Sequence, residues 1–206
     1  MDDSYKTIEK IAEGYITERK SKFISYVIPV KTEDEVKDIL EEYRKEYHNA
    51  RHVCWAYMLG TTREDFRAND DGEPSGTAGR PILGQINSFE LTDVLIIVIR
   101  YFGGTLLGTG GLIRAYKEAA EAAIINATIV EKTINDTFVL HFEYTLLNDV
   151  MRVLHQFEES KWTQNFTETC EMEVTIRQSQ SKQLFDTLSS IYGVIIEGES
   201  QEESAQ

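Results

Sequence analysis

Hydrophobic positions recur with two different periods along the first part of this chain, and each change of period marks a new element. Residues 14–17 and 23–30 are rich in Tyr, Ile and Val, which predicts two strands. Thr32 and Glu35 then form a capping-box pattern that satisfies backbone N–H groups at the start of a helix. Residues 52–59 return to strand-forming side chains. The expected helix carries apolar residues at helical spacing: Val36, Ile39, Leu40, Tyr43 and Tyr47.

The middle of the chain combines one strongly apolar strand with two Gly/Arg-rich segments. The continuously apolar, β-branched run 94–99 predicts a strand that is buried on both faces. Glycines over 103–111 interrupt it, and a helix is expected over 112–126. Residues 69–81, NDDGEPSGTAGRP, contain too much Gly, Pro and Asp for periodic structure and predict a loop. The segments 69–81 and 100–116 are the expected functional surface.

The last third of the chain has a simpler pattern. Alternating side chains from Phe138 to Tyr144 predict a strand, and apolar positions between Leu146 and Phe157 predict an amphipathic helix. The remaining expected elements are strands over 161–166 and 170–177, a helix over 181–188 and a strand over 194–197. This βαββαβ order is the ferredoxin-like plan.

These patterns predict an α+β protein with two domains. The first is an α/β domain over residues 1–132, the second a ferredoxin-like domain over 133–198, and residues 199–206 form an acidic tail that is expected to be disordered. A length of 206 residues exceeds the usual single-domain size. A hydrophobic fraction of 41% supplies both cores and excludes disorder of the whole chain.

Charge is spread unevenly between the two parts. Residues 1–133 carry 22 acidic and 17 basic side chains, whereas residues 134–206 carry 13 acidic and 4 basic ones. Nucleic acid usually requires a basic footprint on its protein partner. The acidic second domain therefore argues against nucleic-acid binding there, and any contact with an anion must come from arginines of the first.

Several classes of site are excluded by missing motifs. The Gly-rich run has neither the lysine of a P-loop nor a dinucleotide fingerprint, so no cofactor is expected. Cys54 and Cys170 sit in alternating apolar runs and lack a CxxC spacing, and the histidines lack metal-ligand spacing, so neither a disulfide nor a metal site is expected. The acidic N-terminus is no signal peptide, and the apolar runs are too short to span a membrane, so the cytoplasm is the expected compartment.

Two arginines point to an anion. Arg100 ends the buried strand, and Arg114 is expected in the first turn of the next helix. A cation in the first turn of a helix is electrostatically unfavourable unless an anion lies next to it. That anion is either an external carboxylate or phosphate, or an internal partner from the other loop. Asp70, Asp71 and Glu73 are the internal candidates, and the residues alone leave both interpretations open.

Two catalytic interpretations of the loop are weaker. Ser75 as nucleophile, with His52 as base and Asp71 as orienting group, lacks the G-x-S-x-G elbow. Asp70, Asp71 and Glu73 as magnesium ligands are the alternative, although a close acidic trio is more often a solvated turn.

Three long motifs resemble those of the IMPACT/YigZ family. They are NARHVCWAY over 49–57, NDDGEPSGTAGRP over 69–81 and VIRYFGGTLLGTGGLIRAY over 98–116, and the resemblance covers nearly the whole chain. It implies a first domain like the second domain of a small-ribosomal-subunit protein. In bacterial members it also implies a ferredoxin-like domain similar to the last domain of elongation factor G. Many members have a tandem histidine where this chain has His52-Val53.

The resemblance also implies a role. Eukaryotic members of the family regulate translation during amino-acid starvation by competing for the scaffold that activates an initiation-factor kinase. The implied partners are the ribosome, RNA or a translation-associated protein, and the family supplies no catalytic residue to carry over.

The sequence therefore favours a non-catalytic, translation- or stress-linked binding protein. The expected partner site is lined by Arg51, His52, Asp71, Glu73, Arg80, Arg100 and Arg114. A hydrolase of phosphoesters or peptides, using Asp71, Glu73, Ser75 and His52, is the alternative. In a third interpretation the same charges form an internal scaffold of ion pairs.

Overall fold

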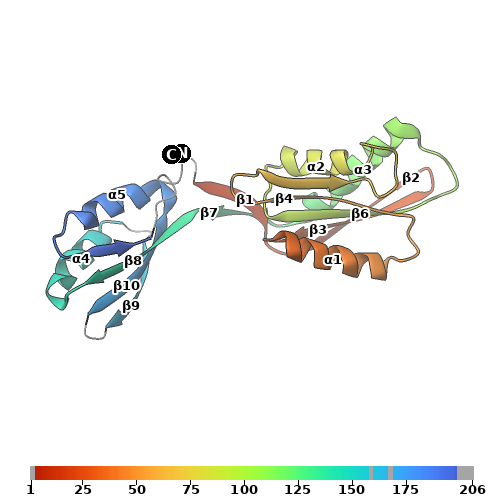
Figure 1. The fold of residues 1–206 in the computed structure, drawn as a ribbon. Helices are drawn as coiled ribbons and strands as arrows, with labels where there is room; N and C mark the ends of the chain where they lie inside the picture. The colour runs from red at the N-terminus through yellow and green to blue at the C-terminus, as the bar shows by residue number, and fades with distance from the viewer. Residues whose placement is uncertain (1–2, 158–159, 167–168, 199–206) are drawn as a thin grey trace. The chain divides into compact units, whose positions relative to one another are not determined.

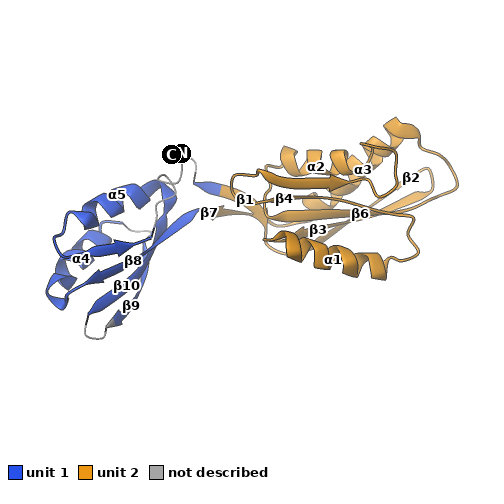
Figure 2. Cartoon of the chain, in the orientation of Figure 1, with its two compact units in different colours: residues 1–4, 133–206 blue, residues 5–132 orange. Residues whose placement is uncertain are grey.

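The chain forms two compact units in a computed structural model that describes residues 3–157, 160–166 and 169–198 (Figure 1). One unit comprises residues 5–132, and the other comprises residues 1–4 with 133–206 (Figure 2). The described residues contain five α-helices and three sheets, which confirms a mixed α/β protein. The expected tail, residues 199–206, lies outside the described residues.

The unit of residues 5–132 is built on a five-stranded antiparallel sheet. Its strand order is β2-β3-β6-β4-β5, so β6 is the central strand. The strands are β2 Ala12–Glu18, β3 Ser21–Pro29, β4 His52–Leu59, β5 Asp65–Asn69 and β6 Val94–Tyr101. A separate two-stranded sheet pairs β1 (Ser4–Ile8) with β7 (Ile129–Thr133).

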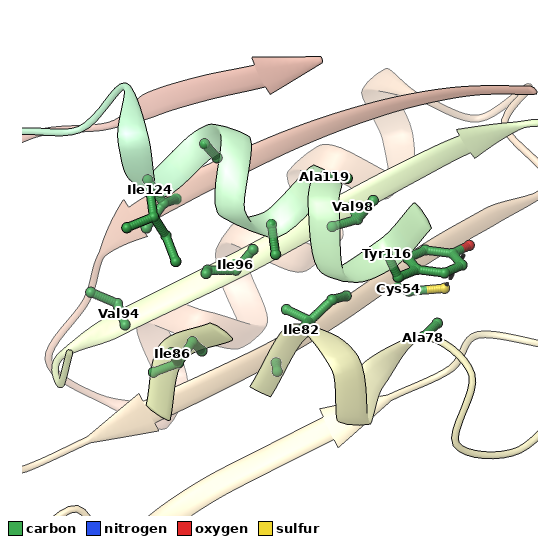
Figure 3. Packing of buried hydrophobic residues seen from close by; sticks show 14 of the residues in the cluster. Cys54, Ala78, Ile82, Ile86, Val94, Ile96, Val98, Tyr116, Ala119 and Ile124 are labelled. Atoms are coloured by element: carbon green, nitrogen blue, oxygen red, sulfur yellow. Dashed lines mark hydrogen bonds between the residues drawn. The ribbon is translucent and has the colours of Figure 1, made fainter. Parts of the chain in front are cut away.

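Helices cover both faces of the five-stranded sheet. Figure 1 shows α2 (Gly79–Ser88) and α3 (Gly108–Ile125) on one face and α1 (Glu33–Glu46) on the other. Val94, Ile96 and Val98 pack with Ile82 and Ile86 of α2 and with Tyr116, Ala119 and Ile124 of α3 (Figure 3). Leu95, Ile97 and Ile99 belong to the core beneath α1. The prediction of a strand buried on both faces is thus confirmed.

Helix α1 begins where its capping pattern predicts. The Thr32 hydroxyl accepts from the Glu35 amide at 3.2 Å. The Glu35 carboxylate reaches back to the Lys31 amide at 2.6 Å, one residue before the cap of an ideal capping box. Both bonds satisfy N–H groups that lack a partner within the helix.

The starts of two helices depart from the sequence predictions. Helix α3 begins at Gly108 rather than at Leu112. Helix α2 begins at Gly79, inside the segment expected to be a loop, because its first amides are capped from a distance. The Asp70 carboxylate accepts from the amides of Ala78 and Gly79, at 3.0 and 2.8 Å. Pro81 fits the first turn because its missing N–H needs no partner there.

The second unit contains a four-stranded antiparallel sheet of order β11-β8-β10-β9. Apolar side chains of α4 and α5 pack with the alternating side chains of β8 and β10 in one core. Asp3 binds Arg177 of this unit, with Oδ1 2.7 Å from Nη2. The elements are β8 Asn135–Phe142, η1 Tyr144–Leu146, α4 Leu147–Leu154, β9 Lys161–Phe166, β10 Cys170–Arg177, α5 Gln178–Ser189 and β11 Ile195–Glu197.

Candidate functional site

The two Gly/Arg-rich segments meet around a cavity of about 360 Å³ in the unit of residues 5–132. Residues from both segments line it, together with the start of β4. Its polar lining includes Arg51, His52, Glu73 and Arg100. Phe102, Leu106 and Leu112 are among its apolar lining residues. The cavity is referred to below as the arginine cavity.

The sheet register places the cavity's central side chains on one face. His52 of β4 is the cross-strand partner of Arg100 of β6. Directly opposed residues in an antiparallel pair project to the same side. Val98, two residues before Arg100, packs against α2 and α3, so Arg100 and His52 point toward the helices and the Asp70–Ala78 loop.

A buried ion pair forms the floor of the arginine cavity. Arg100 Nη1 donates to Glu73 Oε1 at 2.6 Å, and the Tyr116 hydroxyl donates to the same oxygen at 2.8 Å. The side chains of Arg100 and Glu73 are only 6% and 4% exposed. The Arg100 guanidinium also lies over the rings of Phe23 and Phe102, at 5.6 and 5.7 Å.

One nitrogen of Arg100 remains without an acceptor. Its Nε is buried and makes no hydrogen bond to any described residue. Buried polar atoms without a partner are rare in folded proteins, because protein, water or a ligand usually supplies the hydrogen bond. The internal pairing with Glu73 therefore satisfies this arginine only in part.

His52 is held in one orientation by the backbone. Its Nδ1 lies 2.8 Å from the Asp71 carbonyl oxygen, so Nδ1 carries the proton and donates. Nε2 is the nitrogen nearer to Glu73, 3.9 Å from Oε2. The Asp71 carboxylate turns elsewhere and accepts from the Val53 amide at 2.6 Å and from Arg44 at 2.5 Å.

The loop before α2 is organised by Asp70. Its carboxylate accepts from the amides of Gly76, Ala78 and Gly79. Burial raises the pKa of this carboxyl, but the three amide donors outweigh burial and lower it below its ordinary value. Asp70 is thus an ionised cap, and its role depends on contacts across six to nine residues of chain.

Tyr116 and Cys54 complete the network and were missed as site residues by the sequence analysis. The Cys54 thiol donates to the Tyr116 hydroxyl at 3.3 Å, and Figure 3 shows the two side chains together. Burial raises the pKa of both groups well above their ordinary values. Cys54 therefore stays a thiol, which is a poor nucleophile. The sequence pattern predicts apolar core at both positions, and only their contacts in the structure reveal the network.

Other expected site residues lie outside the cavity lining. Arg80, Arg114 and Ser75 are exposed and are not among the described residues that line it. The expectation that Arg114 occupies the first turn of its helix is wrong, because α3 begins at Gly108. The side chain of Asp71 supports the loop instead of lining the cavity.

The side chains named in the two catalytic interpretations do not all gather in the arginine cavity. Asp70, Asp71 and Glu73 each accept hydrogen bonds from different donors, and no group of three metal-binding side chains occurs in the part of the chain that is described. Ser75 does not share the cavity with His52. None of the described helices combines the length and apolar character that crossing a bilayer requires.

Comparison with known proteins gives a consistent result. A profile of the Impact N-terminal domain matches residues 19–124. IMPACT family member YvyE of Bacillus subtilis is 32% identical over 191 residues, which are 93% of this chain and 88% of the relative. IMPACT family member YigZ of Escherichia coli is 36% identical over 140 residues, 67% of this chain and 69% of the relative. A crystal structure of a hypothetical protein matches with a TM-score of 0.70 and 26% identity, over 97% of this chain and 98% of the other.

Proposed function

The chain belongs to the IMPACT family, and on that premise we propose that it is a cytoplasmic, translation-linked regulator that binds its partner through the arginine cavity. The partner is the ribosome, RNA or a translation-associated protein, contacted at an anionic group. Support for the translation link comes from the role that the family resemblance implies.

The observation that carries the proposal is the partly satisfied Arg100. Its Nη1 binds Glu73, whereas its buried Nε has no acceptor among the described residues. Arg51 is exposed at the rim, and no ion pair engages it within the described part of the chain. Two guanidinium groups against one carboxylate leave positive charge in the hollow, which favours a phosphate or carboxylate oxygen.

The apolar lining adds a second requirement on the partner. Phe102 is 44% exposed and Leu106 is 82% exposed, although both line the cavity. Exposed apolar side chains that border a charged hollow are typical of interaction sites. The bound group therefore carries an apolar or aromatic part beside its anion, as a nucleotide or a peptide does.

The second unit is assigned to the ferredoxin-like plan, with the domain boundary near residue 132. The antiparallel order β11-β8-β10-β9 and the alternation of strands with α4 and α5 support this assignment. Because residues 134–206 carry 13 acidic and only 4 basic side chains, the first unit supplies any contact with nucleic acid.

Ribosome co-sedimentation of matched arginine variants tests the proposal. Arg51→Ala removes a rim charge of the cavity, whereas Arg114→Ala removes another exposed charge, outside its lining. We expect wild type to sediment with ribosomes more strongly at low salt than at high salt. Arg51→Ala should weaken this association by about tenfold, the order of one charge-assisted hydrogen bond, while Arg114→Ala leaves it unchanged.

One result would contradict the proposal. Equal sedimentation of wild type and Arg51→Ala would show that the arginine cavity is not part of the contact surface. Arg51 is preferred to Arg100 for this purpose because an exposed arginine can be removed without leaving Glu73 buried and unpaired.

A further inference from the structure

A second hollow of about 420 Å³ lies in the same unit, and its lining is basic and aromatic. It is lined by Tyr15, Lys20, Lys22, Ile24, Tyr101 and Phe102. Phe102 also lines the arginine cavity, so one side chain borders both spaces. This second space is called the aromatic hollow below.

The sheet register places the residues of the aromatic hollow on one face of the sheet. Helix α1 covers another part of the same face. Tyr15 of β2 is opposite Ile24 of β3, and Lys22 of β3 is opposite Tyr101 of β6. Opposed side chains share a face, so residues from three neighbouring strands contribute to one surface. The C-terminal part of α1 covers the adjoining Tyr26, whose ring centroid lies 5.0 Å from that of Tyr43. The Tyr101 hydroxyl donates to Asn49 Oδ1 at 2.9 Å, which holds its ring in place.

A close backbone contact fixes Lys20 beside Phe102. A Cβ atom on Gly103 would lie 2.0 Å from the Lys20 carbonyl carbon and 2.3 Å from the Ser21 amide nitrogen. The Gly103 amide donates to the Ser21 hydroxyl at 3.2 Å. Only glycine permits this approach, so the turn between β2 and β3 is packed directly on the segment that carries Phe102.

The aromatic hollow combines exposed aromatic rings with exposed lysines. Tyr15 is 54% exposed and Phe102 is 44% exposed. Lys20 and Lys22 are exposed and form no ion pair with any described residue, and none of the lining residues is acidic. Aromatic faces that alternate with cations are the means by which proteins hold single-stranded nucleic acid, because every base has a face that stacks and every phosphate a charge.

From this arrangement we infer that the aromatic hollow is a base-stacking site for single-stranded nucleic acid, and that the strand passes over Phe102, the residue that borders both spaces, to the arginine cavity. Bases stack on Tyr15 and Phe102, while Lys20, Lys22 and Arg51 contact the backbone phosphates. The inference deepens the proposed function and rests on it for the use of the arginine cavity. A chain with a net charge of −14 repels nucleic acid in general, so the attraction is confined to this surface.

Fluorescence anisotropy with the full chain tests the inference. The probes are labelled 12-nucleotide oligouridylate and oligothymidylate at low salt, which separate RNA from DNA as the source of the strand. We expect Tyr15→Ala to raise the Kd by about tenfold, in the range that base stacking commonly contributes, and Tyr15→Phe to restore wild-type affinity. Lys22→Ala should weaken binding and reduce its salt dependence.

Two matched controls isolate the surface. Tyr192→Ala removes a 99% exposed tyrosine of the second unit, and Lys117→Ala removes an exposed lysine of α3 outside the hollow. Both should leave the Kd unchanged. Wild-type unfolding temperatures for Tyr15→Ala and Lys22→Ala, which alter exposed side chains, would show that a loss of affinity is not a loss of fold.

The alternatives give distinct results. If neither oligonucleotide binds while ribosome association still depends on Arg51, the inference is overturned and the proposed function stands. Equal affinity for a duplex of the same length, or equal competition by polyglutamate, would overturn base stacking in favour of general attraction to polyanions. Oligonucleotide binding that survives Tyr15→Ala and Lys22→Ala would also exclude this surface.

Discussion

Glu73 is the residue on which the arginine cavity depends. Its Oε1 accepts from both Arg100 and Tyr116, and its side chain is 4% exposed. A carboxylate this deeply buried is tolerated because a cation and a hydroxyl replace its lost water. The ion pair with Glu73 holds the Arg100 guanidinium where it also lies over the rings of Phe23 and Phe102.

Glu73→Gln should therefore destabilise the protein strongly. The substitution keeps the shape of the side chain but leaves the Arg100 charge buried without a counter-ion. Loss of one partner from a buried pair typically lowers the free energy of unfolding by about 3–5 kcal/mol. Urea unfolding measures the change, with Glu118→Gln as an exposed control on α3 that should stay within about 0.5 kcal/mol of wild type. Equal stability of the two variants would contradict the burial of this pair.

At the scale of elements, the Gly-rich segment after β6 contains glycines with different roles. Gly103 packs against the backbone of the turn between β2 and β3. Gly110 lies within α3, and a Cβ added there would meet no atom within 4 Å. The run of glycines is therefore not a uniform flexible loop: one glycine is required by a backbone contact and another is not.

Replacing each of these glycines by alanine should have opposite effects. Gly103→Ala forces the turn away and should lower the free energy of unfolding by about 1–3 kcal/mol, as overpacking usually does. Gly110→Ala should raise it by up to about 1 kcal/mol, since alanine favours a helix more than glycine does. Chemical denaturation of both variants measures the difference. A neutral Gly103→Ala would show that the contact between the turn and the segment is loose.

At the scale of the whole molecule, the two units differ in charge and in the sites that they carry. Both cavities described above are lined by residues of the unit 5–132. That unit also has cores on both faces of its own sheet, whereas the second unit has a separate core. Most of the net negative charge belongs to residues 134–206, with 13 acidic and 4 basic side chains.

Residues 5–132 expressed alone should consequently fold and bind oligouridylate at least as tightly as the full chain. Removal of the acidic part lowers the repulsion of the strand, and the effect should be largest at low ionic strength. Circular dichroism reports folding, and anisotropy reports the Kd. A folded fragment that no longer binds would show that the second unit contributes to the site.

The local pattern of side chains by itself determined much of the fold. The apolar run 94–99 predicted the central strand, and the alternation at Cys170–Arg177 predicted β10. Capping residues Thr32 and Glu35 predicted the start of α1, because all the bonds involved lie within one turn. Such elements follow from neighbours along the chain, which a sequence displays directly.

The composition of the site was decided only by the tertiary structure. Glycine and arginine content singled out both segments, but the choice of Glu73 as the partner of Arg100 depends on the register of β4 and β6 and on a loop capped by Asp70. That cap also begins α2 inside an apparent loop, and the early start of α3 at Gly108 moves Arg114 away from the first turn. Contacts between residues far apart in the chain select among several chemically equivalent partners, and local periodicity contains no information about that choice.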